Sequence, residues 1–465
     1  MELTVWGAAE QVTGSMHLLE FNNYKVLVDC GLDYEKDTFQ EENQNFPFDP
    51  ATINLVILTH AHIDHTGNLP TLIRLGFQGQ VLCTAATADL TALLLMDAVN
   101  IFVAKQKKKS PRGRGRKQHA SGPPPLYLQK HVNDTIDRFI TIGFHRPFKF
   151  HEQASLTFIP MGHLLGAAAA IIEVNDQGTT KRIAFTGDVG RKNYPVLVDP
   201  DPLPPVDYLV MESTYGGRLH TTDSSLEDKL IDTIRESCIK HPGRLIIPAF
   251  SIGRTQALVY TLNKIFSKGL LPRVQIFVDS PMANFATDIY RKHHHLVNDK
   301  ARAFYDTQGD EFEFESLSYV TDKKESVTIS NYHEPCIIIS SAGMLEGGRI
   351  QDHLFHNIQN YYCTILFIGY CAPGTLGNRL LRGDPIVRLR GRDLMVYATI
   401  KQTDLLSGHG DHLDLVNTVS TQQQAELKNI FLVHGESKSM VQLKDALSTL
   451  GYTSTIAEKG TTYKL

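Results

Sequence analysis

The sequence predicts a layered α/β fold with more than one domain. Short apolar runs rich in β-branched residues or leucine recur along the chain, which is typical of buried strands. In the middle of the chain such runs alternate with segments of helical character, which favours a parallel α/β sheet. The length of 465 residues exceeds what one ordinary hydrophobic core accommodates, so we expect at least two cores.

The first set of predicted strands ends in acidic or histidine residues. These strands cover residues 24–29, 53–60, 183–188, 209–212 and 430–434. In layered α/β proteins, ligand sites gather in the loops that leave the strands. We therefore expect the residues at these strand ends to form a functional site.

The second set of predicted strands lies between the fourth and fifth strands of the first set. It covers residues 245–248, 274–279, 336–340 and 364–369, with a helix predicted over 255–266. This order predicts a domain inserted into another domain. We place the first part of the outer domain at 1–216, the inserted domain at 217–398 and the second part of the outer domain at 399–465.

Composition excludes several classes of protein. Hydrophobic residues make up 42% and charged residues 21% of the chain, as in soluble globular proteins, and the net charge of −4 gives no overall indication of nucleic-acid binding. The six cysteines form no C-x-x-C pair, which argues against a disulfide framework or a thiolate zinc site. We see no secretory signal and no apolar run near the roughly 18–20 residues of a bilayer span, and expect a cytoplasmic protein without a membrane partner.

One stretch, residues 105–125, departs from the average composition. It carries eight basic side chains, among them Lys107, Lys108 and Arg112, and then reads SGPPP. High charge, no apolar face and helix-breaking residues predict a flexible surface loop. Such a loop is either simply solvated or an arm that holds a polyanion through phosphate contacts.

The strongest chemical signal is the segment 60–65, which reads HAHIDH directly after an apolar strand. Imidazoles two residues apart on an extended segment project to the same side, and the turn that follows brings Asp64 and His65 to face a neighbouring point. One segment can therefore serve two metal ions. Histidine and carboxylate ligands without thiolate suit zinc, although manganese and iron remain open on ligand type alone.

Two metal ions need more ligands than this segment supplies, and other strand ends offer them. The additional candidates are His163 in GHLLG, Asp188 in TGDVG and His434 in LVHGE. Each of these residues alone fits a polar strand terminus equally well. Their order along one chain favours a shared metal site.

The segment 60–65, followed by His163 and Asp188 and preceded by Asp29 in LVDCG, resembles the motif series of metallo-β-lactamase-fold hydrolases. Glu212 in MESTYG, His409 in SGHGD and His434 resemble the β-CASP branch of that superfamily. The segments GAAEQVTGS at 7–15 and DSPM at 279–282 also resemble it. The resemblance implies a metallo-β-lactamase αββα sandwich with an inserted β-CASP α/β domain. That branch contains bacterial ribonucleases and the endonuclease subunit of eukaryotic mRNA 3′-end processing.

The resemblance also implies a role for each matching residue. Two zinc ions are expected, one held by His60, His62, His163 and Asp188, the other by Asp64, His65, His434 and the shared Asp188. Asp64, Asp29, Glu212 and His409 are expected catalytic residues, with Asp29 orienting a ligand or the bridging water. His409 is the candidate general acid with Glu212 beside it, although without the family a loop histidine and a helix cap fit equally well.

The expected substrate is RNA, most simply a single strand. Within β-CASP proteins, a histidine at the last motif, here His434, accompanies RNA-cleaving members. Ser341, Gly343 and Arg349 follow the strand 336–340, where backbone N–H groups and the guanidinium can cradle a phosphate, or form a plain strand-to-helix turn. A homodimer is one oligomeric state that the sequence allows.

Two other functions fit part of the sequence. The first is a hydrolase of DNA or of a small molecule on the same metal core. The inserted domain and the pair of Glu212 and His409 argue against a small substrate. The second is a catalytically inactive scaffold in an RNA-processing complex, but such proteins usually lose metal ligands and every expected position is filled here.

Overall fold

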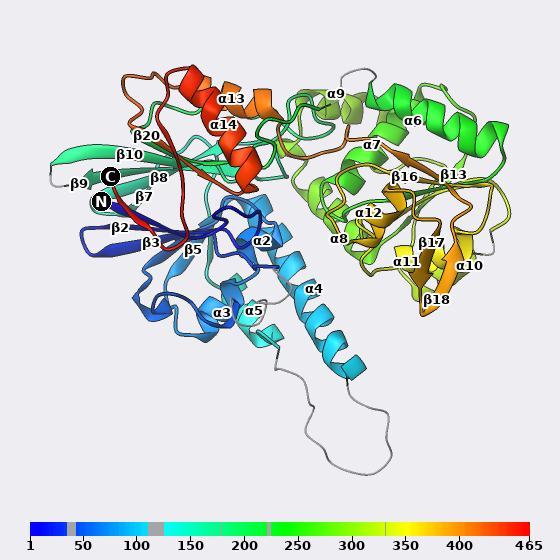
Figure 1. Ribbon diagram of the computed structural model, residues 1–465, viewed down its shortest axis with the longest axis horizontal. Helices are drawn as coiled ribbons and strands as arrows, with labels where there is room; N and C mark the ends of the chain where they lie inside the picture. The colour runs from blue at the N-terminus through cyan, green and yellow to red at the C-terminus, as the bar shows by residue number, and fades with distance from the viewer. Residues whose placement is uncertain (35–42, 110–124, 177, 221–224, 331) are drawn as a thin grey trace, which may run out of the picture. The chain divides into compact units, whose positions relative to one another are not determined.

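The computed structural model describes residues 1–34, 43–109, 125–176, 178–220, 225–330 and 332–465 (Figure 1). The chain divides into two compact units, one comprising residues 1–192, 199–219 and 409–465, the other 193–198 and 220–408. The second unit is thus inserted in the first, as the sequence predicts. The sequence places the boundaries at residues 216 and 398, whereas the structure divides the chain after 219 and 408 and adds 193–198 to the inserted unit.

The first unit contains two seven-stranded sheets. The first sheet has the order β22 (Thr462–Lys464), β1 (Glu2–Gly7), β2 (Met16–Phe21), β3 (Tyr24–Val28), β4 (Leu55–Ile57), β5 (Gln80–Cys83) and β6 (Phe139–Thr141). The second has the order β21 (Ser454–Ile456), β20 (Asn429–Val433), β11 (Tyr208–Glu212), β10 (Thr179–Phe185), β9 (Ala168–Asp176), β8 (Ala154–Pro160) and β7 (Phe148–His151).

Helices cover the outer faces of both sheets, so the first unit has four layers (Figure 1). Alternation along β11 shows the principle, because Val210 packs in the core between the sheets while Leu209 and Met211 face the helices. The predicted αββα sandwich is confirmed. The helices are η1 (Pro50–Thr52), α2 (Ile63–Thr66), α3 (Leu69–Arg74), α4 (Ala85–Lys109), α5 (Gln129–Ile136), α13 (His412–Ser420) and α14 (Ser437–Thr449).

The second unit is built on a six-stranded parallel sheet, as predicted. Its order is β14 (Leu317–Tyr319), β13 (Gln275–Asp279), β15 (Cys336–Ser340), β12 (Arg244–Pro248), β16 (Cys363–Phe367) and β19 (Thr399–Gln402), with a separate hairpin of β17 (Ile386–Leu389) and β18 (Arg392–Met395). Because all six strands are parallel, their carboxyl ends share one edge of the sheet and their amino ends the other.

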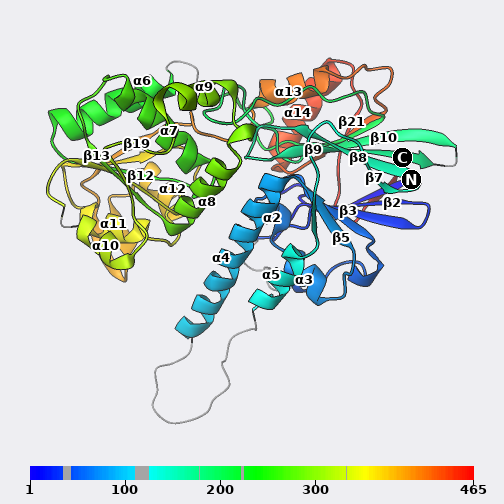
Figure 2. The same cartoon turned by 180° about the vertical axis from the view of Figure 1, so that it is seen from behind.

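Helices lie on both faces of this sheet, with α6 and α7 on one side and α10 and α11 on the other (Figures 1 and 2). The helical segments are α6 (Leu226–Ile234), η2 (Arg235–Lys240), α7 (Arg254–Ser267), α8 (Pro281–Lys292), η3 (His294–Leu296), α9 (Asp299–Gln308), α10 (Lys323–Ile329), α11 (Ile350–Asn357) and α12 (Leu376–Leu381). Parallel sheets are buried on both faces, which explains the nearly continuous apolar sequence of β15, CIIIS.

Helix α4 differs from two expectations drawn from the sequence. The first was that no apolar run approaches the length of a bilayer span. The stretch Ala85–Val103 has a mean hydropathy of 1.6 over 19 residues and by length and composition alone is sufficient to cross a membrane, although 44% of its apolar window is buried. A core helix of a soluble protein passes the same test, so this is weak evidence for a membrane span. This stretch was not recognised from the sequence because Asp89 and Asp97 interrupt the apolar run.

The second correction concerns the basic stretch. We expected a loop from residue 105 onward, but residues 105–109 continue α4. Lysine is a good helix former, and the first helix-breaking residue is Pro111. Residues 110–124 lie outside the described part of the chain.

Candidate metal centre

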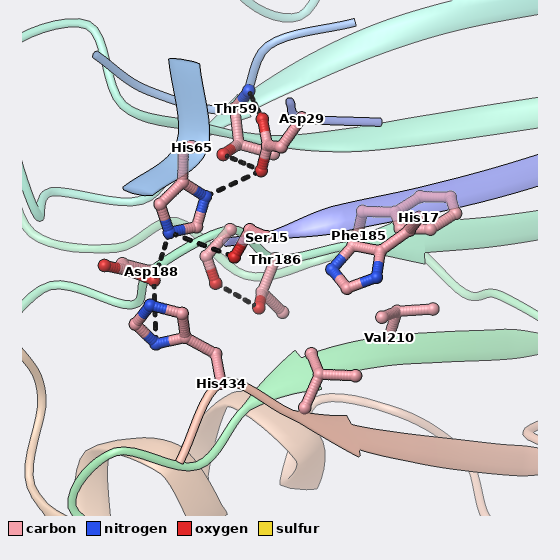
Figure 3. Close-up of a pocket in the computed structure, with 12 residues that line it drawn as sticks. Ser15, His17, Asp29, Thr59, His65, Phe185, Thr186, Asp188, Val210 and His434 are labelled. Carbon is pink, nitrogen blue, oxygen red and sulfur yellow. Dashed lines mark hydrogen bonds and ion pairs between the residues drawn. The ribbon is translucent and has the colours of Figure 1, made fainter. Parts of the chain in front are cut away.

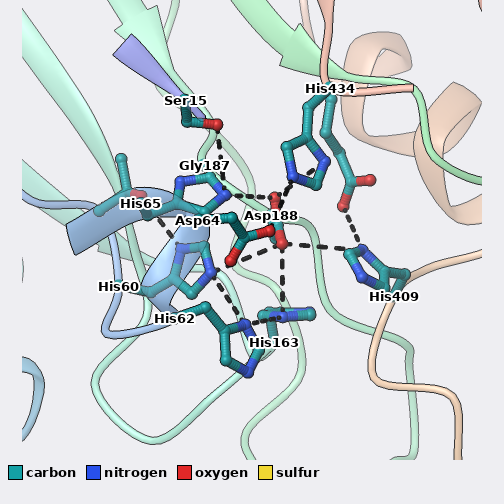
Figure 4. Close-up of polar contacts among 12 residues, drawn as sticks. Ser15, His60, His62, Asp64, His65, His163, Gly187, Asp188, His409 and His434 are labelled. Atoms are coloured by element: carbon teal, nitrogen blue, oxygen red, sulfur yellow. Dashed lines mark hydrogen bonds and ion pairs between the residues drawn. The ribbon is translucent and has the colours of Figure 1, made fainter. Parts of the chain in front are cut away.

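The seven predicted metal ligands lie together in the first unit (Figure 4). They come from the loops that follow four strands and from the short helix α2. The loop after β4 supplies His60 and His62, α2 supplies Asp64 and His65, the loop after β8 supplies His163, the loop after β10 supplies Asp188, and the end of β20 is followed directly by His434.

Three imidazoles and one carboxylate form the first cluster. Nδ1 of His62 lies 3.2 Å from Nε2 of His60 and 3.1 Å from Nε2 of His163. Oδ2 of Asp188 lies 3.5 Å from Nε2 of both His60 and His163. One atom of each side chain therefore faces a common point.

The second cluster is formed by Asp64, His65 and His434, and Asp188 adjoins it. Oδ1 of Asp188 lies 3.4 Å from Nε2 of His65 and 3.5 Å from Nδ1 of His434. Oδ2 of Asp64 lies 3.5 Å from Nε2 of His434. Asp188 thus presents one carboxylate oxygen to each cluster, which suits a ligand shared between two ions.

The residues present fit metal binding. A tetrahedral zinc ion with bonds of about 2.0–2.1 Å places its ligand atoms roughly 3.3–3.4 Å apart, close to the separations of the first cluster. Two buried polar atoms, Oδ1 of Asp188 and Nε2 of His434, accept or donate no hydrogen bond. Such atoms are costly unless they have a partner, and an ion would supply one.

The protonation of the first cluster favours metal binding. Burial lowers the pKa of His62 to about 4 and that of His60 well below its usual value, and neighbouring histidines lower the latter further. Both imidazoles are therefore neutral at neutral pH, which is the form that coordinates a metal. All six cysteines are buried and free, and among the described residues the metal-binding clusters contain none of them.

In the second cluster the pKa values of the histidines are raised rather than lowered. Burial alone would lower the pKa values of His65 and His434, but Asp188 outweighs it and raises both, and Asp29 raises that of His65 further. For Asp64 the directions are reversed. Burial alone would raise its pKa, but His434 and His65 outweigh burial and bring the pKa to about 2. Without a metal ion, protons on these two histidines balance the carboxylates.

Asp29 supports His65 from behind the cluster (Figure 3). Its Oδ2 lies 2.7 Å from Nδ1 of His65. Thr59 donates from its backbone N to Oδ1 and from its hydroxyl to Oδ2, both at 2.8 Å. This fixes the ring so that Nε2 faces Asp188.

The backbone turns sharply where the ligands leave the strands. Asp29 and His434 have φ values of 60° and 50°, in the left-handed region that few side chains adopt. Gly187 precedes Asp188 with φ of 55°, and a Cβ there would lie 2.6 Å from Cβ of Thr59. A glycine at this position therefore lets the Asp188 loop approach the His60 loop closely.

Glu212 and His409 form a pair beside the first cluster. Nδ1 of His409 lies 3.3 Å from Oε1 of Glu212 and 3.9 Å from Oδ2 of Asp188. The buried Glu212 is fixed because Oε1 also accepts from the backbone N of Val189 at 2.6 Å. His409 keeps 20% of its side chain exposed, so a substrate has access to it.

Besides Thr59, three supporting residues were not recognised from the sequence. Ser15 Oγ lies 3.4 Å from Nε2 of His65, and Thr214 Oγ1 lies 3.1 Å from Nδ1 of His434. His17 lines a small pocket behind the second cluster with its ring stacked on Phe185 (Figure 3). Serine, threonine and buried histidine are too common for the sequence to mark them, although Ser15 ends the segment 7–15.

The predicted phosphate cradle lies in the second unit. Ser341 and Gly343 follow β15, but Arg349 donates to Oδ1 of the buried Asp279 at 2.6 Å and to the carbonyl of Thr321 at 2.7 Å. Its guanidinium is therefore engaged within the protein. Lys107 and Lys108 lie in the last turn of α4, with side chains outside the described structure, and Arg112 lies outside the described residues altogether.

Comparison with known proteins agrees with this architecture. Three family models match the chain: the metallo-beta-lactamase superfamily over residues 10–154, the Beta-Casp domain over 255–380 and the Zn-dependent metallo-hydrolase RNA specificity domain over 393–457. A crystal structure of a protein of unknown function from Enterococcus faecalis matches with a TM-score of 0.55 at 14% identity, covering 100% of this chain and 99% of that one.

Named relatives extend the match over the whole chain. Ribonuclease TTHA0252 of Thermus thermophilus is 30% identical, covering 99% of both chains, and transcription termination factor FttA of Methanosarcina mazei is 28% identical over 96% of this chain and 69% of its own. Endoribonuclease YSH1 of Eremothecium gossypii is 28% identical over 95% of this chain but 56% of its own length. With one relative matched almost from end to end and the domain models in the expected order, the chain belongs to the β-CASP branch of the metallo-β-lactamase superfamily.

Proposed function

We propose that the protein is a zinc-dependent ribonuclease that hydrolyses phosphodiester bonds of single-stranded RNA. The observation that carries this proposal is the pair of ligand clusters that share Asp188. The first zinc ion is assigned to His60, His62, His163 and Asp188, and the second to Asp64, His65, His434 and Asp188. Two bound zinc ions supply hydroxide at neutral pH and offset charge on a phosphoryl oxygen.

The charge of the site selects an anionic substrate. Asp64 and Asp188 offset only two of the four positive charges that two zinc ions carry, so the site retains a positive charge. A phosphodiester anion matches it. RNA is favoured over DNA by His434 at the last motif, by relatives named ribonuclease and endoribonuclease, and by the match to an RNA specificity domain over residues 393–457.

His409 is assigned as the general acid. Its Nδ1 faces Glu212, which leaves Nε2 to donate a proton to the departing ribose oxygen. The neighbouring carboxylate stabilises the imidazolium that this role requires. A ribose oxygen is a poor leaving group, so the proton matters for RNA and much less for a phenolate that leaves as an anion.

The test compares two substrates in one variant. In His409→Ala we expect RNA cleavage to fall by about 10²–10⁴-fold, the usual contribution of a general acid, while hydrolysis of bis-p-nitrophenyl phosphate stays within a few-fold of the wild-type rate. Both rates are measured at matched zinc content. His145→Ala, at a surface histidine with 57% of its side chain exposed, is the control and is expected to leave both rates unchanged.

Equal losses on the two substrates would contradict the proposed role of His409 and assign it to metal binding or folding. Wild-type protein that binds about two zinc ions per chain but hydrolyses neither RNA nor the activated diester would contradict the proposed function itself. In that case an inactive scaffold is the correct interpretation.

A further inference from the structure

A second candidate binding site lies at the amino edge of the parallel sheet in the second unit. It is a cavity of about 360 Å³ with predominantly polar walls. Arg244 begins β12 and Tyr362 directly precedes β16, so the cavity lies at the edge opposite to Ser341 and Gly343. The residues of its lining that matter here are Arg244, Tyr332, His333, His356, Asn357 and Tyr362.

Arg244 contributes the positive charge of its guanidinium to this cavity. Its guanidinium donates to Oδ1 of Asn357 at 3.1 Å, to the carbonyl of Ser330 at 3.2 Å and to the carbonyl of Tyr332. All three acceptors are neutral, and among the described residues no carboxylate pairs with this partly buried arginine. An arginine whose side chain is held in place by neutral hydrogen-bond acceptors, without a carboxylate partner, is suited to bind an anionic group such as phosphate.

Exposed tyrosines flank the cavity. Tyr362 in its wall is 64% exposed, and its neighbour Tyr361 is 72% exposed. The ring of Tyr361 stacks on that of Tyr397 with centroids 4.7 Å apart and planes at 9°. Flat, accessible aromatic rings of this kind stack on nucleic-acid bases without regard to sequence.

Two further arginines lie close to Phe355, the chain neighbour of the cavity-lining His356. Arg390 and Arg392, in and beside the β17–β18 hairpin, lie 5.2 and 5.8 Å from the ring centre of Phe355. That ring lies 5.3 Å from the ring of His356 in the cavity wall. Asp352 pairs with Arg390, whereas Arg392 is exposed and has no carboxylate partner in the described chain.

We propose that the amino-edge surface, defined by Arg244, Tyr361, Tyr362, Arg392 and Tyr397, binds single-stranded RNA. A backbone phosphate is assigned to Arg244 and bases to the tyrosines, with Arg392 as a second phosphate contact. Glu334 also lines the cavity, but it is exposed, so solvent screens its negative charge. The inference rests on the proposed function, because it adds a docking surface for the same polymer that the metal centre hydrolyses.

The experiment measures RNA binding by the fluorescence anisotropy of a labelled oligouridylate of 20 nucleotides. All proteins carry Asp64→Asn so that the RNA is not consumed. In Tyr361→Ala/Tyr362→Ala we expect the Kd to rise about 25-fold or more, since each of the two stacked bases contributes at least about 1 kcal/mol and 1.4 kcal/mol corresponds to tenfold. Both side chains are exposed, so their removal does not disturb the core.

Charge is tested separately through salt dependence. Each lost phosphate contact should reduce the slope of log Kd against log salt by about 0.7, the value for single strands. We expect this change in Arg392→Ala and in Arg244→Gln, where glutamine keeps an amide donor near Asn357 but removes the charge. Tyr305→Ala, at a 47% exposed tyrosine of α9 in the same unit, is the matched control and should bind RNA like the parent.

The outcomes separate this inference from the proposed function. Unchanged Kd and salt slope in all three amino-edge variants would overturn the docking surface even if the wild-type protein cleaves RNA. Weakened binding in these variants, with bis-p-nitrophenyl phosphate hydrolysis intact when Asp64 is restored, supports it. Weakened binding together with a wild-type protein that cleaves no RNA supports the surface and refutes the proposed ribonuclease activity.

Discussion

The imidazole of His65 depends on Asp29, whose carboxylate lies 2.7 Å from Nδ1 and is itself held by Thr59. Asp29→Asn removes the negative charge behind the ring while preserving size. Because such supporting carboxylates orient metal-binding histidines and raise their basicity, we expect zinc affinity at the second cluster to fall about 10–100-fold. Competition with a chelator of known affinity measures this change, and unchanged affinity would mean that Asp29 has only a folding role.

Glu173→Gln is the matched control for that variant. Glu173 lies on β9 in the same unit, 44% exposed, and pairs with Arg182 rather than with any candidate metal ligand. Its replacement also removes one carboxylate charge, so it corrects for a general change in the charge of the protein. We expect zinc affinity in Glu173→Gln to equal that of the wild type.

Some of the centre was predictable because its chemistry is local in the sequence. The segment 60–65 places two imidazoles, a carboxylate and a third imidazole within one loop and the start of α2, and no distant partner is needed to recognise it. Thr59 and Thr214 were not predictable. Their role depends on Asp29 and on His434, which are 30 and 220 residues away.

The pairing of Arg349 with Asp279 could not be predicted from the sequence either, because the two residues belong to different parts of the fold. The sequence left open whether Arg349, which follows a glycine-rich turn, contacts a phosphate or belongs to a plain strand-to-helix turn. In the structure its guanidinium pairs with Asp279 at the end of β13, 70 residues away. Ser326 and His353 also bind the same carboxylate, at 2.5 and 2.7 Å. This network joins β13 to α10 and α11, and only the folded sheet brings these residues together.

Arg349→Ala is expected to destabilise the second unit by about 3–5 kcal/mol, the usual cost of removing one partner from a buried ion pair. Asp279 is fully buried and Arg349 is 20% exposed, so solvent screens the pair little. Urea unfolding at pH 7 measures the loss. A loss below about 1 kcal/mol would leave Arg349 available for the phosphate contact that the sequence suggested.

The pH dependence gives a second readout of that pair. Burial alone would raise the pKa of Asp279, but hydrogen bonds from His353, Ser326 and Arg349 outweigh it and hold the pKa below its usual value. The stabilisation is therefore fully present above the unfolded-state pKa and is lost as pH falls through the folded-state value. We expect the difference between wild type and Arg349→Ala to shrink in acid.

Across the whole chain, metal binding should stabilise the two units unequally. The candidate ligands come from separate segments of the first unit, between His60 and His434, whereas the second unit contributes none of them. An ion that binds only the folded form adds about 4 kcal/mol at a free concentration of 1,000 times its Kd. We expect calorimetry to show two transitions, of which zinc removal lowers only that of the first unit.

The two transitions can be assigned with variants, because Arg349→Ala should lower the second unit's transition and Asp29→Asn should reduce the effect of zinc on the first.

The stabilisation of the first unit by zinc should also depend on pH. Burial alone would lower the pKa of His65, but Asp188 and Asp29 raise it well above its usual value, so the metal-free folded protein retains this proton at neutral pH and zinc must displace it. The proton's own stabilising contribution is complete below the unfolded-state pKa and fades as pH rises through the folded-state value. The gap between zinc-loaded and metal-free protein should therefore widen from pH 6 to pH 8, and a gap that narrows over this range would contradict the assignment of His65 as a ligand.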